Sequence, residues 1–67
     1  MRWREIEEAW PSLESRATIR WDLIGKAEMS RTCGRREALA ELVGERCGLA
    51  REAAEREVEE WRRTLHG

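Results

Sequence analysis

The sequence contains no phenylalanine and no tyrosine, so every aromatic contact available to it comes from four tryptophans, Trp3, Trp10, Trp21 and Trp61. Proline occurs once, as Pro11, and β-branched residues are few, which favours helices over strands. No segment alternates between apolar and polar residues over the length of a strand. These absences argue against a β-sheet and predict an all-α fold.

Long apolar runs are also missing. A membrane-spanning helix needs about 20 apolar residues in succession, and the N-terminal residues lack the apolar centre of a signal peptide. Charged residues make up 40% of the chain, yet thirteen basic and fourteen acidic residues leave a formal net charge of only -1. No long-range field therefore attracts the chain to nucleic acid or anionic lipid. We expect a cytoplasmic protein that does not bind membranes.

Soft metal ligands are scarce, because the chain has two cysteines, Cys33 and Cys47, and one histidine, His66. A structural zinc site normally takes four such ligands, so we expect no metal site and no cofactor. His66 lies in a terminal segment of the kind that frays, which argues against a Cys–His nucleophilic pair. Without an export signal, the two thiols are expected to be reduced rather than joined in a disulfide.

The chain of 67 residues is expected to form a single domain over residues 1–67. A domain of this size buries only about 60% of the surface that its unfolded chain exposes, so a few large side chains must supply most of the core. Apolar residues recur at intervals of three and four, which places them on one face of each helix. The predicted core consists of Trp3, Trp10, Leu13, Trp21, Ile24, Leu39, Val43, Val58 and Trp61.

The same spacing predicts a compact orthogonal bundle of about four short helices. They are expected at residues 3–10, 11–24, 35–47 and 50–65, with one or two further helical turns at 26–32. Pro11 suits the first turn of the second helix, and Gly25 is expected to end it. Gly44, inside the helix at 35–47, lowers its intrinsic stability by up to about 1 kcal/mol relative to alanine.

A ladder of residues along the whole chain is more specific than any one of its parts. It reads Trp3-x-x-Ile6-Glu7, Trp10-x-x-Leu13, Trp21, Ile24-x-x-x-Glu28, Gly34-Arg35-Arg36-Glu37-x-Leu39, Glu45-Arg46-Cys47-Gly48 and Arg51-Glu52-x-Ala54-Glu55, leading to Val58 and Trp61. With this ladder the chain resembles the CsbD-like family of bacterial stress-response proteins. The resemblance implies a small cytoplasmic all-α protein, and it brings no catalytic or ligand-binding residues with it.

Ile19 and Leu23 do not fit the core pattern of the predicted second helix. At 100° per residue they point roughly 160–260° away from the stripe that carries Trp21, and one helix cannot bury both of its faces in a single small core. In the CsbD-like family that the chain resembles, these positions and that of Leu42 are usually polar or charged. The three residues are therefore candidates for a protein-contact face, with a partner or with a second copy of the chain. Scattered exposed apolar residues are the alternative interpretation.

Arginines gather around Gly34, where Arg31, Arg35 and Arg36 are candidates for contacts with phosphate at a helix start. A nonspecific single-strand binder would also use exposed aromatic side chains, and the tryptophan spacing instead places those in the core. A solvated basic patch is the simpler interpretation.

Carboxylates form a column at i,i+4 spacing, at Glu37, Glu41 and Glu45. Such a column could receive a cation or a basic partner, but a solvated helix face is the simpler interpretation. General acid–base catalysis would need a carboxyl in a dry cleft, and a bundle this small rarely has one. We expect no catalytic residues.

These features predict a non-enzymatic, stress-response-associated protein that acts through protein–protein contacts. Two alternatives stay open at this stage. One is a nucleic-acid-associated protein that uses the arginines around Gly34, and the other is a small protein inhibitor or regulator of a larger machine.

Overall fold

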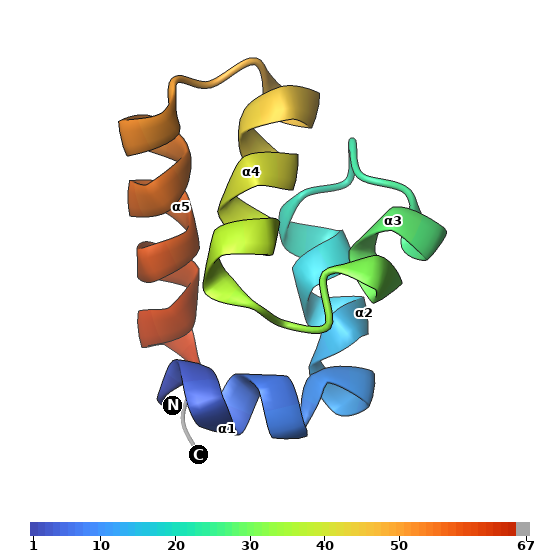
Figure 1. Ribbon diagram of the computed structural model, residues 1–67. Coiled ribbons are helices and arrows are strands. Elements are labelled where there is room, and N and C mark those ends of the chain that lie inside the picture. The colour runs from blue at the N-terminus through green and yellow to red at the C-terminus, as the bar shows by residue number, and fades with distance from the viewer. Residues whose placement is uncertain (66–67) are drawn as a thin grey trace.

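The computed structural model describes residues 1–65, which form five helices and no strand. The helices are α1 (Trp3–Glu8), α2 (Trp10–Arg20), α3 (Lys26–Arg31), α4 (Arg36–Cys47) and α5 (Arg51–Thr64). α4 and α5 lie antiparallel, α3 packs against α2, and α1 runs across the foot of the bundle (Figure 1). The prediction of an all-α fold is therefore confirmed, and the turns expected at 26–32 form α3.

α4 and α5 begin and end within one residue of their predicted bounds. α4 ends in a Schellman motif, in which Gly48 adopts the left-handed conformation (φ 64°, ψ 38°) and the amide of Leu49 donates to the carbonyl oxygen of Gly44 at 3.0 Å. A Cβ at position 44 would lie 3.3 Å from the carbonyl oxygen of Leu49 and 3.5 Å from Cβ of Ala54. Gly44 weakens α4 locally, but it permits the close turn that returns the chain along α5.

α2 ends at Arg20, so the prediction of a helix as far as Ile24 is wrong. Residues 21–24 form turns instead, in which the amide of Ile24 donates to the carbonyl oxygen of Trp21 at 3.0 Å. The turns still bring both side chains into the core, which is why the sequence retains a helical spacing of apolar residues there. Gly25 is not the end of α2. It is the extended residue before α3 (φ -68°, ψ 153°), and its amide donates to Oε1 of Glu28 at 3.4 Å.

The structure buries every predicted core residue except Trp3, which is half-buried. Trp3 lies at the rim between α1 and α5, where its Nε1 donates to Oε2 of Glu59 at 3.3 Å. The buried set also contains Ile6, Ala17, Met29, Ala40, Ala54 and Leu65.

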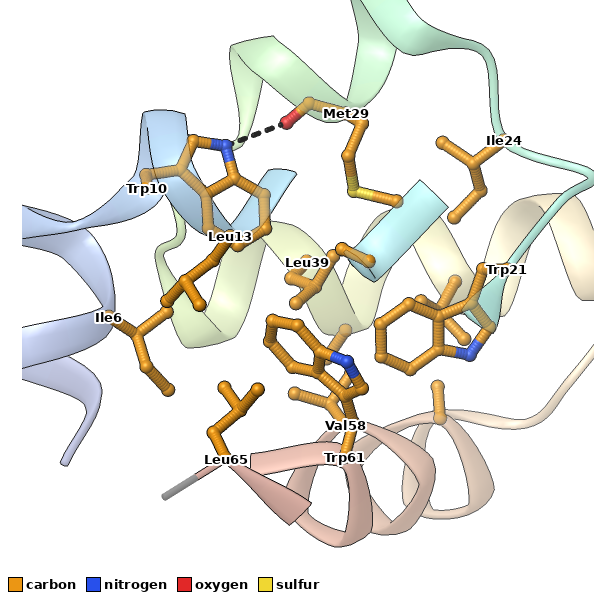
Figure 2. Close-up of a cluster of buried hydrophobic side chains, with 14 residues drawn as sticks. Ile6, Trp10, Leu13, Trp21, Ile24, Met29, Leu39, Val58, Trp61 and Leu65 are labelled. Carbon is orange, nitrogen blue, oxygen red and sulfur yellow. Dashed lines mark hydrogen bonds between the residues drawn. The ribbon is translucent and has the colours of Figure 1, made fainter. Parts of the chain in front are cut away.

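Three tryptophans form the centre of this core. The ring of Trp61 lies 6.1 Å from that of Trp10 at 82°, an edge-to-face contact, and 5.5 Å from that of Trp21 at 58° (Figure 2). Nε1 of Trp10 donates to the carbonyl oxygen of Met29 at 3.2 Å, and Nε1 of Trp21 donates to Oε1 of Glu57 at 3.1 Å. The indole of Trp10 therefore joins α2 to α3, and that of Trp21 joins the turns after α2 to α5, by hydrogen bonds as well as by packing.

Candidate contact surfaces

Ile19 and Leu23 protrude from the C-terminal end of α2. Their exposed fractions are 81% and 66%, and they are the exposed large hydrophobic residues of the part of the chain that the structure describes. Ile19 belongs to the last turn of α2, whereas Leu23 lies in the turns that follow it. The two residues thus do not share a helical face as predicted, but both remain outside the core.

The backbone beneath these two side chains is held in place by the residues between them. Nη2 of Arg20 pairs with Oε1 of Glu57 at 3.0 Å, and its guanidinium lies 5.3 Å from the ring centre of Trp21. The indole of Trp21 donates to the same oxygen of Glu57. α5 therefore anchors the end of α2, and the backbone that carries Ile19 and Leu23 is held in place by these contacts.

Leu42 does not share their exposure. It is half-buried and packs against the core. Its outer edge lines a hollow between α3 and α4, together with Arg31 and Ala38, and neither Ile19 nor Leu23 lines that hollow. The usually polar character of this position in the CsbD-like family predicted a contact residue, but Leu42 is partly buried against the core instead.

The three candidate phosphate-binding arginines are all exposed, and each lines a hollow that is rich in carboxylates. Arg31 faces the hollow that also contains Glu28, Glu41 and Glu45, and Arg35 and Arg36 line another with Glu7, Glu37 and Glu41. A phosphate bound in either hollow would meet more negative than positive side chains. The charge of these hollows therefore disfavours phosphate.

The backbone around Gly34 offers little to an anion. The amide of Gly34 donates to Oγ1 of Thr32 at 3.4 Å, and the amide of Arg35 donates to the carbonyl oxygen of Thr32 at 3.0 Å. Stacking of bases is also disfavoured, because Trp10, Trp21 and Trp61 are at most 4% exposed. No observation at this loop favours nucleic acid.

The carboxylate column of Glu37, Glu41 and Glu45 is exposed on α4. These three residues form one side of a groove between α4 and α5, which we call the α4–α5 groove. Its lining also contains Ala40, Gly44, Leu49, Arg51 and Glu55. Within residues 1–65, no ion pair involves the column, and no group of His, Cys, Asp or Glu has a metal-binding arrangement.

The cysteines are both free and lie in different surroundings. Cys33 is exposed and has a positive φ of 53°, whereas Cys47 is half-buried against the core as a small apolar side chain. The remaining soft ligand, His66, lies outside the described residues.

Comparison with known proteins identifies the family of the chain. UPF0337 proteins of Bordetella pertussis, Bordetella parapertussis and Bordetella bronchiseptica are each 40% identical to it over 52 residues, which is 78% of this chain and 79% of the relative. The chain belongs to the UPF0337 family. UPF0337 proteins are the CsbD-like proteins, in agreement with the resemblance carried by the tryptophan and glycine ladder. No family model matches this UPF0337 chain, and no solved structure matches it.

The names of these UPF0337 relatives state no activity. Among residues 1–65 of this UPF0337 protein, no helix is both long enough and apolar enough to cross a membrane.

Proposed function

We propose that this UPF0337 protein is a non-enzymatic, cytoplasmic protein of the bacterial stress response that acts through protein–protein contacts made by Ile19 and Leu23. The observation that carries the proposal is the exposure of these two side chains, 81% and 66%, on a domain whose other large apolar residues within 1–65 are at least partly buried. Burial of both at an interface would contribute roughly 3–6 kcal/mol before the costs of association.

The support beneath the two residues favours a contact role. Arg20 is paired with Glu57 on α5 and packs over Trp21, so the end of α2 is already ordered in the free chain. A surface that is rigid before binding loses less conformational entropy when a partner covers it. Ile19 and Leu23 are therefore suited to form a small, preorganised contact.

The surroundings of the carboxylates support a role without catalysis. A general acid or base near neutral pH would need a carboxyl whose pKa is raised in a dry site. The pKa of Glu59 is instead lowered, chiefly by the hydrogen bond that Arg62 donates to it, which is the behaviour of a structural ion pair. Exposed charged side chains line each of the two hollows that contain the candidate arginines, so neither hollow is a dry site.

The stress-response part of the proposal is supported by membership of the UPF0337 family together with the CsbD-like resemblance. Its test is an immunoblot of the chain in its own cells before and after osmotic stress and entry into stationary phase. We expect the amount per cell to rise severalfold. A constant amount under both conditions would contradict this part and leave the contact role to be judged separately.

The contact role is tested with the double variant Ile19→Glu and Leu23→Lys, which leaves the net charge unchanged. The matched control is Arg56→Glu with Glu60→Lys, two exposed residues of α5 that also exchange charge without a net change. We expect light scattering and pull-down to show association for the wild type and the control, but not for the Ile19 and Leu23 variant.

Circular dichroism must show the same helicity in all three proteins, because the altered residues lie outside the core. A folded Ile19 and Leu23 variant that associates as well as the wild type would refute the contact role.

A further inference from the structure

We infer that the partner of Ile19 and Leu23 is a second copy of this chain, and that the two residues of one copy dock in the α4–α5 groove of the next. This inference rests on the proposed function, because it names what covers the same two side chains. We call Ile19 and Leu23 the apolar knob.

The apolar knob is flanked by cationic side chains. Arg16 precedes Ile19 by three residues and so lies on the same side of α2, and Lys26 follows Leu23 by three residues at the start of α3. Both are exposed, and neither takes part in an ion pair within the described residues. The acidic residues at this end are Asp22 and Glu57, and Glu57 is already paired with Arg20, so the flanks keep a positive balance.

The α4–α5 groove has the complementary character. Its floor is formed by small or apolar residues, which leaves room for protruding side chains. Four glutamates face one arginine, and that arginine is only 3.5 Å from Glu55 on its own helix. The floor residues are Ala40, Gly44 and Leu49, and the charged residues are Glu37, Glu41, Glu45, Glu55 and Arg51.

Within residues 1–65 the carboxylate column of this groove forms no ion pair, although Arg31, Arg35 and Arg36 line neighbouring hollows with its glutamates. Glu37, Glu41 and Glu45 repeat at i,i+4, a spacing at which like charges destabilise a helix. None of the three forms an ion pair within residues 1–65, although the chain is rich in arginine. Cationic side chains of a docked neighbour, such as Arg16 and Lys26, would relieve that repulsion.

A symmetric contact of the apolar knob with itself fits less well. It would bring the cationic flanks of two copies together. Two side chains per copy also cover far less than the about 800 Å² per partner that a stable interface buries. Docking of the knob in the α4–α5 groove adds the surfaces of two helices to the buried area. It also brings the cationic flanks next to the glutamates of the groove, so the asymmetric contact is favoured.

The two surfaces belong to different parts of the fold. The apolar knob lies at the end of α2, which packs with α3, whereas the groove lies between α4 and α5 (Figure 1). One copy can therefore offer its knob to one neighbour and its groove to another. Such head-to-tail contacts produce rings when the rotation closes and open chains when it does not.

The test uses two variants that each lose one surface. The knob variant is Ile19→Glu with Leu23→Lys, and the groove variant is Glu45→Arg with Glu55→Arg. The control for the groove variant is Glu8→Arg with Glu60→Arg, which makes the same change of charge at exposed residues outside the groove. Helicity is checked by circular dichroism. A variant that does not fold is replaced by its milder form, Ile19→Ser with Leu23→Ser or Glu45→Gln with Glu55→Gln.

Sedimentation velocity over a range of concentrations gives the decisive result. We expect the mass of the wild type and the control to rise with concentration, while each variant alone stays monomeric. An equal mixture of the two variants should form a dimer and stop there, because one intact knob meets one intact groove. Higher salt should weaken the wild-type association by about tenfold or more, since its flanks are ionic.

Other outcomes separate this inference from the proposed function. A groove variant that associates like the wild type, with a knob variant that does not, would show a symmetric knob contact and overturn the inference alone. The wild type could instead stay monomeric at every concentration and bind a different protein that the knob variant no longer binds. That result would overturn the inference and identify that protein as the partner of the knob. A knob variant that associates like the wild type would overturn both proposals.

Discussion

Gly34 lies directly against the indole ring of Trp10. A Cβ at position 34 would lie 2.8 Å from Cε3 of Trp10 and 3.2 Å from the carbonyl oxygen of Ile6. The indole is held from its other edge, because its Nε1 donates to the carbonyl oxygen of Met29. The loop from α3 to α4 therefore fits the aromatic core only because position 34 has no side chain.

Substitution of Gly34 by alanine is expected to destabilise the domain by about 1–3 kcal/mol through overpacking, in addition to the strain of an alanine at φ 74°. The control is Gly48→Ala, because Gly48 has a similar φ of 64° but no atom within 4 Å of an added Cβ. Urea denaturation of both variants measures the difference. Equal losses of stability would mean that the contact with Trp10 has no energetic consequence.

Trp61→Ala and Trp21→Ala are each expected to unfold the domain at room temperature, so that neither variant shows a cooperative thermal transition. Truncation of a buried tryptophan costs about 3–5 kcal/mol, and the core of a domain this small rarely supplies more than that. Trp3→Ala serves as the comparison. Because Trp3 is only half-buried, this variant should stay folded and show a measurable thermal transition. Circular dichroism melts decide the matter. A Trp61 variant that melts within a few degrees of the wild type would contradict the central place of its ring.

Glu59 is expected to make the free energy of unfolding depend on pH, with a loss of stability in acid. Its pKa is lowered chiefly by the hydrogen bond from Arg62, with a smaller effect of the indole of Trp3. A carboxyl whose pKa is lower in the folded state stabilises the protein above its unfolded pKa, and this contribution is lost as the pH falls through the folded pKa. Glu59→Gln should therefore be less stable than the wild type at neutral pH, and the difference should shrink in acid.

Thermal melts from neutral to acidic pH measure this effect. Glu60→Gln is the control, because Glu60 is exposed and makes no ion pair among the described residues. A constant difference between Glu59→Gln and the wild type at all pH values would show that the lowered pKa is not coupled to folding.

The two thiols are expected to react at different rates in the native protein. Cys33 is exposed and should react rapidly with a thiol reagent, whereas Cys47 packs against the core and should react fully only after denaturation. Reductants and chelators should leave the thermal midpoint nearly unchanged. A midpoint that falls by about ten degrees or more with reductant would indicate a structural disulfide and would also count against a reducing compartment.

The bounds of α4 and α5 were predictable because local signals define them. Gly48 ends α4 through a left-handed conformation that depends on neighbouring residues alone. The end of α2 was not predictable in this way, because Trp21 and Ile24 keep a helical spacing while the backbone turns. Burial in the shared core, rather than periodicity, determines where these two side chains point.

The candidate surfaces were predictable to a similar extent. The exposure of Ile19 followed from its offset from the core stripe of α2, whereas Leu23 is exposed as predicted although the helix has ended before it. The surroundings of Arg35 and Leu42 did not follow, since Glu7 of α1 comes to line the hollow of Arg35 and Leu42 packs partly against the core. Contacts between residues that are distant in sequence decide such surroundings.

By itself, the sequence determined the helical class, most of the large side chains of the core and the two apolar residues left outside it, because helical periodicity and turn chemistry act over a few residues. Tertiary structure alone decided that Gly34 meets Trp10, that Glu57 joins Arg20 to Trp21, and that a carboxylate column borders a groove with an apolar floor. Each of these depends on how separate helices approach one another. That approach is set by the packing of whole side chains in one shared core, which no short segment of the chain encodes.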